Sequence, residues 1–204
     1  MIHPQVAAHA ASLRDPDGFW LPLARKLITW IKTPTQALAK GNSSPNSKWA
    51  WFPDGTLNTC YNCVDRHPPS RVAFQYVSSV ADTRETITYG QLRQRVERVA
   101  GMLKYELHVK KGDTVIIYSI GLLWVMLMLV PMIPEAVYGM LACARIGAIH
   151  SVVFGGFAAA ELAKRVDDSK AKVVLTASCG IEPKGVIPYK RSSVADVSDF
   201  SPGR

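Results

Sequence analysis

The stretch PMIPEAVYGMLACARIGAIHSVVFGGFAAAELAKRVDDSKAKVVLTASCGIEP (residues 131–183) decides the fold, because helical and strand patterns alternate along it. Pro134 suits the first position of a helix, and Gly147 suits the position just after its end. Between them, apolar residues recur at helical spacing. These residues are Val137, Met140, Leu141 and Ala144. The stretch therefore opens with a predicted amphipathic helix.

Two predicted strands and a second helix follow it. Residues 149–154 and 172–177 are short apolar runs rich in β-branched side chains, which is typical of strands. Gly155-Gly156 predicts a turn, and residues 158–168 predict the helix between the two strands. Strands that alternate with helices imply right-handed βαβ crossovers and a mainly parallel sheet. The predicted fold class is α/β.

The region before this stretch shows further elements of the same kind. Residues 72–77 and 85–88 predict two strands, and Thr88 with Gln91 predicts a capping box at a helix start. Residues 115–118 predict another strand. The apolar stripe of the capped helix consists of Leu92, Val96, Val99 and Leu103.

The first part of the chain predicts a helical arm. Asp15 can cap a helix that starts at Pro16, and residues 33–34 (Thr-Pro) are expected to stop it. The expected apolar face consists of Trp20, Leu23, Leu27 and Trp30. Residues 41–47 (GNSSPNS) predict an exposed loop.

One run does not fit this alternation. No charged residue occurs from position 114 to 134, and an apolar run of this length qualifies as a transmembrane candidate. Its two ends already belong to a predicted strand and a predicted helix, however, and removing residues 119–130 leaves an ordinary strand–loop–helix unit. We therefore interpret 119–130 as an apolar insertion, whose deletion should improve solubility. The alternative is a non-enzymatic protein anchored in a membrane by this run.

Composition is that of a globular protein, and the charge is basic. The 204 residues are 48% hydrophobic and 20% charged, with a formal net charge of +8, which favours anionic partners. We interpret the basic cluster of Arg93, Arg95 and Arg98 as a solvated helix face. With four cysteines and no recognisable leader at the start, we expect a reducing cytoplasmic setting rather than the mitochondrial matrix.

No complete catalytic site is legible. Cys60, Cys63 and His67 supply three potential zinc ligands where a structural site usually has four, and their loop context does not favour a redox pair. The glycine pair at 155–156 lacks the rest of a phosphate-loop or dinucleotide motif.

Several segments together closely resemble the short-chain AMP-forming acyl-CoA synthetases, of the acetyl- and propionyl-CoA synthetase type within the adenylate-forming superfamily. These segments are WFPDGTLNTCYNCVDRH (51–67), ITYGQL (87–92) and the opening stretch. The resemblance runs from about residue 7 to about residue 190. It implies an N-terminal helical arm (1–67), followed by the first βαβ units of a partial AMP-binding domain (68–191). Residues 192–204 diverge and predict a disordered tail.

The resemblance also implies an activity and its partners. The family converts a small carboxylate, acetate or propionate, with ATP and coenzyme A into acyl-CoA, AMP and pyrophosphate, and Mg²⁺ screens the phosphate charge. Residues Glu182, Pro183, Lys184 and Gly185 stand where the family usually has Glu-Pro-Gly-Arg, a segment that contacts coenzyme A. The cysteines are not metal ligands in this family.

The departures from the family are as informative. The ATP phosphate loop, the nucleotide contacts and the catalytic lysine of the family lie beyond residue 204, so no catalytic residue and no metal ligand is assigned here. We expect this chain to be a fragment that is inactive alone, with no nucleic-acid partner and no membrane association. The sequence does not separate acetate from propionate.

Overall fold

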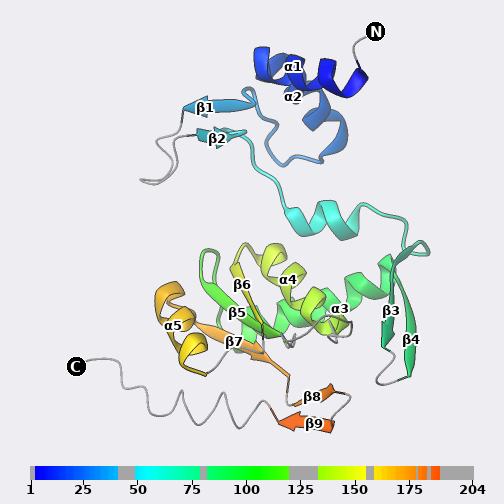
Figure 1. Cartoon of the computed structure of the whole chain (residues 1–204), viewed down its shortest axis with the longest axis vertical. Helices are drawn as coiled ribbons and strands as arrows, with labels where there is room; N and C mark the ends of the chain where they lie inside the picture. Colours follow the sequence, from blue (N-terminus) through cyan, green and yellow to red (C-terminus); the bar gives the residue numbers. More distant parts are fainter. Residues whose placement is uncertain are drawn as a thin grey trace. The chain divides into compact units, whose positions relative to one another are not determined.

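The computed structural model describes residues 3–40, 49–78, 82–119, 133–154, 159–177, 179–182 and 185–188. The chain forms two compact units, Met1–Asn58 and Thr59–Arg204. Figure 1 shows the helices and strands that make up each unit. They are described separately below.

The first unit contains two helices and a short antiparallel pair of strands. Helix α1 (Pro4–Arg14) is followed directly by α2 (Pro16–Leu27), and β1 (Leu38–Lys40) pairs with β2 (Trp49–Trp51). The Asp15 side chain accepts a hydrogen bond from the amide of Gly18 at 2.9 Å, which confirms the predicted helix cap. Neither α1 nor the strand pair was expected from the sequence.

The predicted face and end of α2 are wrong. Leu21 and Ala24 are its buried residues, whereas Leu23 is exposed. The helix ends at Leu27 because the backbone of Ile28 is extended. Trp30 lies beyond the end, and its indole nitrogen donates to the Ala24 carbonyl at 3.0 Å. The same carbonyl accepts from the amide of Ile28 at 3.0 Å, so the tryptophan adds a second hydrogen bond at the end of the helix.

The second unit begins with a π-helical turn and a hairpin that leads into a long helix. Strands β3 (Val72–Ser78) and β4 (Thr83–Thr88) pair antiparallel, and Thr88 then caps α3 (Tyr89–Gly101). The Gln91 amide donates to the Thr88 hydroxyl at 3.3 Å, and the Thr88 amide donates to the Gln91 side chain at 2.9 Å. The predicted capping box is confirmed. Helix α3 continues into the π-helical turn η2 (Met102–Glu106).

The stripe predicted for this helix is largely correct. Leu92, Val96 and Leu103 are buried, together with Ala100, and Val99 packs against them partly exposed. Burial of this face fixes α3 against the core of the second unit.

A three-stranded parallel sheet forms the centre of the second unit (Figure 1). Strand β5 (Thr114–Ser119) lies between β6 (Ile149–Phe154) and β7 (Val173–Thr176), and both neighbours run parallel to it. Helix α4 (Pro134–Ile146) follows β5 in the chain, and α5 (Ala159–Ser169) follows β6. The predicted α/β class with parallel strands is confirmed, although the other strand pairs are antiparallel.

The two helices cover opposite faces of β5. A side chain added at Gly139 of α4 would lie 3.3 Å from Ile117, so this helix packs closely on the face that carries Ile117. Ile116 and Tyr118 point to the other face, where they cluster with Leu162 of α5. A strand buried on both faces is what a parallel sheet requires, because its crossover helices lie on both sides.

The face predicted for α4 is only half right. Val137, Met140, Leu141 and Ala144 are each partly buried. The fully buried residues of the helix are Pro134, Ala136, Tyr138, Gly139, Ala142 and Cys143. Small residues on this face let the helix approach the sheet closely, and a periodicity argument that counts only large apolar residues overlooks them.

The apolar run lies mostly outside the described residues. Ser119 is the last residue of β5, and residues 120–132 are not described. Of the helices that the structure describes, none combines the length and apolar character needed to cross a membrane. The insertion and the membrane anchor both remain hypotheses from the sequence.

Candidate functional site

The carboxyl ends of the parallel strands define the first candidate site. Helix α4 lies on one face of the sheet and α5 on the other, and the strand order β6–β5–β7 reverses between β5 and β7. In open α/β sheets, ligands bind outside the carboxyl ends of the strands at such a reversal. The segments 155–158 and 120–132, which follow two of these strands, lie outside the described residues.

An antiparallel hairpin follows this edge directly. Strand β8 (Cys179–Glu182) comes two residues after the end of the described β7 segment, which stops at Ala177, and pairs with β9 (Gly185–Pro188). The register sets Glu182 opposite Gly185. Two of the four residues expected to contact coenzyme A thus face each other at the end of a hairpin. Pro183 and Lys184 lie outside the described residues.

A buried ion-pair cluster joins three elements of the second unit. One nitrogen of the Arg145 guanidinium donates to both carboxylate oxygens of Asp65 at 2.9 Å. The Asp65 side chain is only 8% exposed, and Arg93 lies 3.3 Å from it. Arg93 also pairs with Glu97 at 2.8 Å. The cluster ties the turn η1 (Tyr61–Asp65) to α3 and α4.

The charge state of Arg145 follows from this arrangement. Burial alone would lower the pKa of Arg145, but the hydrogen bond and the charge of Asp65 outweigh it and raise the pKa. Arg145 therefore stays charged although it is largely buried. A buried pair of this kind is costly to break from one side, because the remaining partner keeps an uncompensated charge. We assign it a structural role.

A second polar cluster ties the β3–β4 hairpin to the helices. Arg95 donates to Glu85 and to the Tyr138 hydroxyl, each at 2.6 Å. Burial raises the pKa of Tyr138, and the nearby Arg95 offsets part of that increase. Arg93 and Arg95 therefore take part in tertiary contacts, and the prediction of a merely solvated arginine face is wrong for both. Only a three-dimensional arrangement reveals their partners, which lie on other elements.

The cysteine motif is divided between the interior and the surface. Cys60 is buried in the core and Cys63 is exposed. Burial raises the pKa of the Cys60 thiol. The ring of His67 stacks on Tyr89 with centroids 4.4 Å apart. Within the described ranges, no three or more His, Cys, Asp or Glu side chains come together in a way that could hold a metal ion. That Cys60, Cys63 and His67 bind no zinc stays a prediction from the sequence.

Comparison with known proteins identifies the family. A family profile described as "AMP-binding enzyme" matches residues 61–201, and one described as "Acetyl-coenzyme A synthetase N-terminus" matches residues 6–63. The chain belongs to the AMP-binding enzyme family. The two matches together run through both units, and the resemblance to short-chain acyl-CoA synthetases is confirmed.

Individual relatives agree with this assignment. The chain is 48% identical over 184 residues to "Acyl-CoA synthetase short-chain family member 3, mitochondrial" of Rattus norvegicus, which covers 88% of this chain and 25% of that protein. It is 44% identical over 186 residues to "Acetyl-coenzyme A synthetase" of a Bradyrhizobium strain, with 89% of this chain and 26% of that protein covered. The chain thus spans about a quarter of the length of these relatives.

A solved structure supports the fold. "Acetoacetyl-CoA Synthetase from Streptomyces lividans" matches with a TM-score of 0.78 over 97% of this chain and 28% of that one, at 23% identity. At this identity the match bears on the fold alone. The AMP-binding enzyme family accounts for the α/β architecture with its parallel strands.

Proposed function

We propose that this chain is the amino-terminal part of an AMP-forming acid–thiol ligase that joins acetate or propionate to coenzyme A. The observation that carries the proposal is the pair of adjoining family matches, which together extend from residue 6 to residue 201. Relatives named as acyl- and acetyl-CoA synthetases, at 44 to 48% identity, support the same reaction class.

The proposed reaction has two steps. A carboxylate oxygen attacks the α-phosphorus of ATP, the bond from that phosphorus to the oxygen shared with the β-phosphate breaks, and pyrophosphate leaves. Mg²⁺ bound to ATP would screen the phosphate charge. The coenzyme A thiol, having lost its proton, then attacks the acyl carbonyl of the acyl-AMP, and AMP departs. Both steps depend on holding the reactants in line and on compensating negative charge.

In this proposal the chain's own contribution is to the binding of coenzyme A. Glu182, Pro183, Lys184 and Gly185 would contact its nucleotide end, with the Lys184 ammonium beside a phosphate. Strands β8 and β9 follow β7 in the chain, and their register sets Glu182 opposite Gly185. This arrangement supports the assignment. A lysine offers a point charge where the family's arginine offers a planar fork, so the contact should be weaker than usual.

The chain alone should not carry out the first step, because it corresponds to a quarter of the relatives' length. We expect no pyrophosphate release when the purified 204-residue chain is mixed with ATP, Mg²⁺ and acetate or propionate. Turnover above that of a boiled control would overturn this part of the proposal.

Coenzyme A binding tests the hairpin assignment independently of turnover. Isothermal titration should show that Lys184→Gln weakens the binding of coenzyme A by about fivefold, the loss expected for one charge–phosphate contact at an exposed site. Lys164→Gln on α5 removes the same charge elsewhere and should leave the affinity unchanged. Equal affinities of both variants would remove the hairpin from the site.

The location in the cell also belongs to this proposal. A cytoplasmic enzyme remains our expectation, and fractionation of cells that express the tagged chain would test it. Recovery with mitochondria or in the membrane pellet would contradict it.

A further inference from the structure

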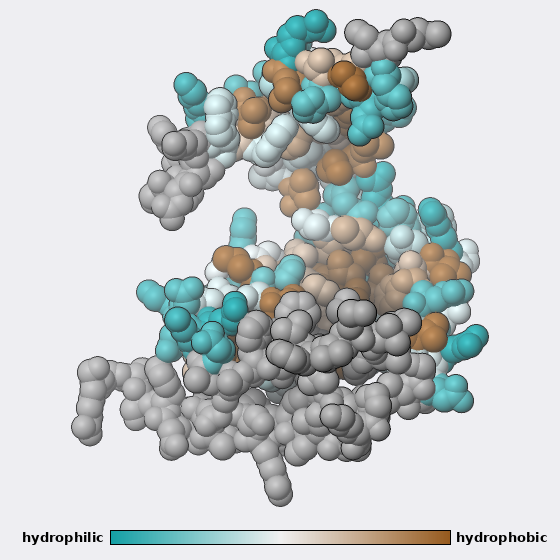
Figure 2. Space-filling model, viewed as in Figure 1, coloured by the Kyte–Doolittle hydropathy of each residue, from teal (hydrophilic) through white to brown (hydrophobic). Residues whose placement is uncertain are grey.

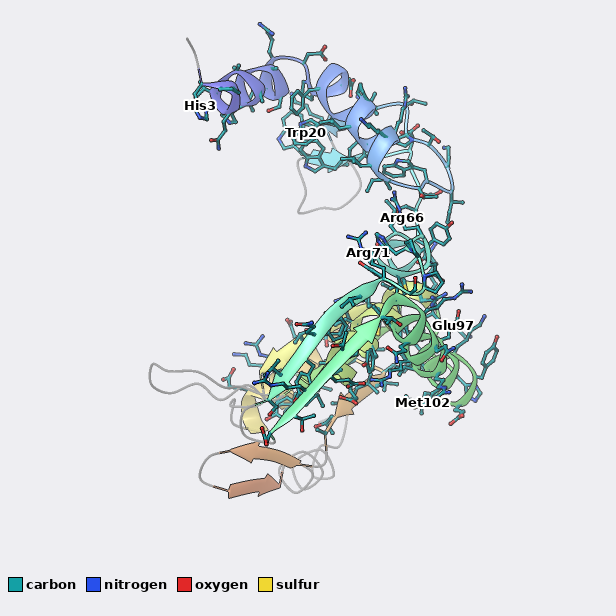
Figure 3. The ribbon with its side chains drawn as sticks, turned by 90° about the vertical axis from the view of Figure 1, so that its right-hand side faces the viewer. His3, Trp20, Arg66, Arg71, Glu97 and Met102 are labelled. Carbon is teal, nitrogen blue, oxygen red and sulfur yellow. The ribbon has the colours of Figure 1, made fainter. Side chains whose placement is uncertain are left out.

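A hollow on the second unit lies at the edge of the sheet opposite the proposed coenzyme A site. Its volume is about 740 Å³, and its lining comes from the end of α3, from η2, from the loop before β5 and from the last turn of α4. Residues that directly precede β5 and β6 lie at the amino ends of these parallel strands. Figure 3 labels Glu97 on α3 and Met102, which begins η2, in the part of the unit that carries this hollow.

The lining carries an excess of positive charge. Lys104, Lys110, Lys111 and Arg145 contribute to it, against the single carboxylate of Glu97. Arg145 pairs with Asp65 at 2.9 Å and Glu97 with Arg93 at 2.8 Å, so both charges are already compensated. The three lysines form no ion pair with any residue in the described part of the chain.

In contrast to the three lysines of the hollow, the neighbouring Lys172 is paired with a carboxylate. Lys172 donates to Asp113 at 3.0 Å and to the carbonyl of His108 at 2.5 Å. Asp113 also accepts from the amide of Lys110 at 2.8 Å, and this bond, the bond from Lys172 and the charges of both lysines lower the pKa of Asp113. Cations gathered in a hollow with an apolar floor raise the local concentration of anions.

The helix end accounts for only part of this charge. Lys104 lies in the last turn of η2, where a cation complements the partial negative charge of the helix C-terminus. Lys110 and Lys111 follow that end by several residues, beyond the reach of the effect. The stem of Lys111 instead runs beside Gly147, where an added side-chain carbon would lie 3.0 Å from its Cγ. The stem of Lys111 thus lies close to the backbone of Gly147.

The hollow also offers apolar and aromatic surface. Val109 is buried beneath it, and Ala100 and Ile146 add further apolar lining. The ring of Tyr105 is 71% exposed, an unusual position for a large aromatic side chain. The volume falls in the range of about 300–1,000 Å³ that small-molecule sites occupy.

We propose that this hollow binds a small organic phosphate, a dianionic phosphate group attached to an aromatic body, at the amino edge of the sheet. The phosphate would lie among Lys104, Lys110 and Lys111, and the aromatic body would contact Tyr105. The occupant is a small molecule rather than a nucleic acid, because the cations line one hollow and do not form an extended track. This proposal does not depend on the ligase activity.

The test uses 1-naphthyl phosphate, which is neither ATP, coenzyme A nor a carboxylate substrate. Isothermal titration of the full chain at constant ionic strength should give saturable binding with one site. The double variant Lys110→Gln/Lys111→Gln should weaken it by roughly tenfold, the effect of two exposed charges at about half a power of ten each. A matched variant, Lys26→Gln/Lys164→Gln, removes the same net charge from residues that do not line the hollow and should bind as the parent does.

A second pair of variants tests the aromatic contact. Tyr105→Ala should weaken the binding of 1-naphthyl phosphate severalfold, whereas Tyr105→Phe keeps the ring and should have little effect. Inorganic phosphate carries no aromatic ring. Its affinity should therefore fall in Lys110→Gln/Lys111→Gln but stay the same in Tyr105→Ala. Because Tyr105 is exposed, neither substitution should alter the thermal unfolding of the chain.

Three results would overturn the proposal. The first is the absence of saturable binding by the parent chain. The second is an equal loss of affinity for the probe in Lys110→Gln/Lys111→Gln and in Lys26→Gln/Lys164→Gln, which would indicate non-specific charge attraction. The third is displacement of the probe by coenzyme A together with indifference to Lys110→Gln/Lys111→Gln, which would place the probe at the coenzyme A site. A failure of pyrophosphate or coenzyme A experiments leaves these outcomes unchanged.

Discussion

The amino-terminal unit and the second unit of this chain differ in how their apolar side chains are buried. In the first unit, Leu21, Ala24 and Ala37 are buried, while Trp49 and Trp51 are exposed. Figure 2 shows hydrophobic residues interspersed with hydrophilic ones on the visible surface of this unit. In the second unit the buried residues form two continuous clusters around α3, α4 and β5.

Different interactions stabilise the two units. The first relies on ring contacts and on hydrogen bonds to carboxylates: Trp20 and Trp51 meet edge to face at 5.7 Å, and Asp17 accepts from the amide of Ala37 at 2.6 Å. Figure 3 shows Trp20 on α2 in this unit. The second unit relies on close-packed burial, in which removing a single methylene group is felt. The two units should therefore respond differently to the same kind of substitution.

The largest expected contrast concerns the accessibility of the core of the second unit. Burial raises the pKa of Cys143 to about 11, so at about pH 8 its thiol is almost entirely protonated as well as enclosed. Iodoacetamide should alkylate the exposed Cys63 more than about a hundredfold faster than Cys143, as followed by peptide mass spectrometry. The contrast should vanish in urea.

Equal alkylation rates for Cys63 and Cys143 in the native chain would contradict the close-packed core. A rise in Cys143 labelling as the pH increases toward 11 is expected only from the gain in thiolate, because the raised pKa keeps the thiol protonated below that range.

The next contrast compares leucine truncations in the two units. Leu103 is fully buried and Leu27 is 58% exposed. Leu103→Ala should lower the free energy of unfolding of the second unit by about 2–5 kcal/mol, because it removes buried methyl groups and leaves a cavity. Leu27→Ala should change the stability of the first unit by no more than about 0.5 kcal/mol. Urea titration followed by circular dichroism measures both. Similar decreases in the free energy of unfolding from the two substitutions would contradict this difference between the units.

The smallest expected effect should be the same in both units. Thr88 caps α3 and Asp15 caps α2, each through a hydrogen bond from a backbone amide. Substitution of either by alanine should cost about 1 kcal/mol locally, and the released amide of Gln91 or Gly18 should exchange its hydrogen about fivefold faster. Hydrogen exchange by NMR checks this. If only one of the two substitutions destabilised its helix, the insensitive helix would be stabilised mainly by contacts other than its cap.

Local signals in the sequence predicted much of the fold. The capping box at Thr88 and the cap at Asp15 each depend on a residue three positions away, and strands β5, β6 and β7 depend on short apolar runs. These features can be predicted because the residues that form each of them are close together in the sequence. The rule for crossovers predicted parallel strands, whereas the order of the strands within the sheet was not predicted.

What the sequence could not show are contacts that depend on the folded chain. Asp65 and Arg145 are 80 positions apart, and nothing in either neighbourhood indicates the other. The same holds for Arg95 and Tyr138, which are 43 positions apart. The buried face of α4 was missed because glycine and alanine carry no strong apolar signal. The basic hollow was missed because its lysines are spread over separate elements.

The position of β5 in the middle of its sheet has a consequence during protein synthesis. Both of its neighbours, β6 and β7, come later in the chain, and β6 begins at Ile149, some 30 residues after β5 ends at Ser119. At roughly 5–20 residues per second, a ribosome needs about two to six seconds to make that interval. For that time the central strand, in which residues 115–118 are all buried in the folded unit, has emerged without a partner on either side. The nascent chain is therefore most open to chaperone binding, and to aggregation, in the window between its central strand and the first neighbour that pairs with it.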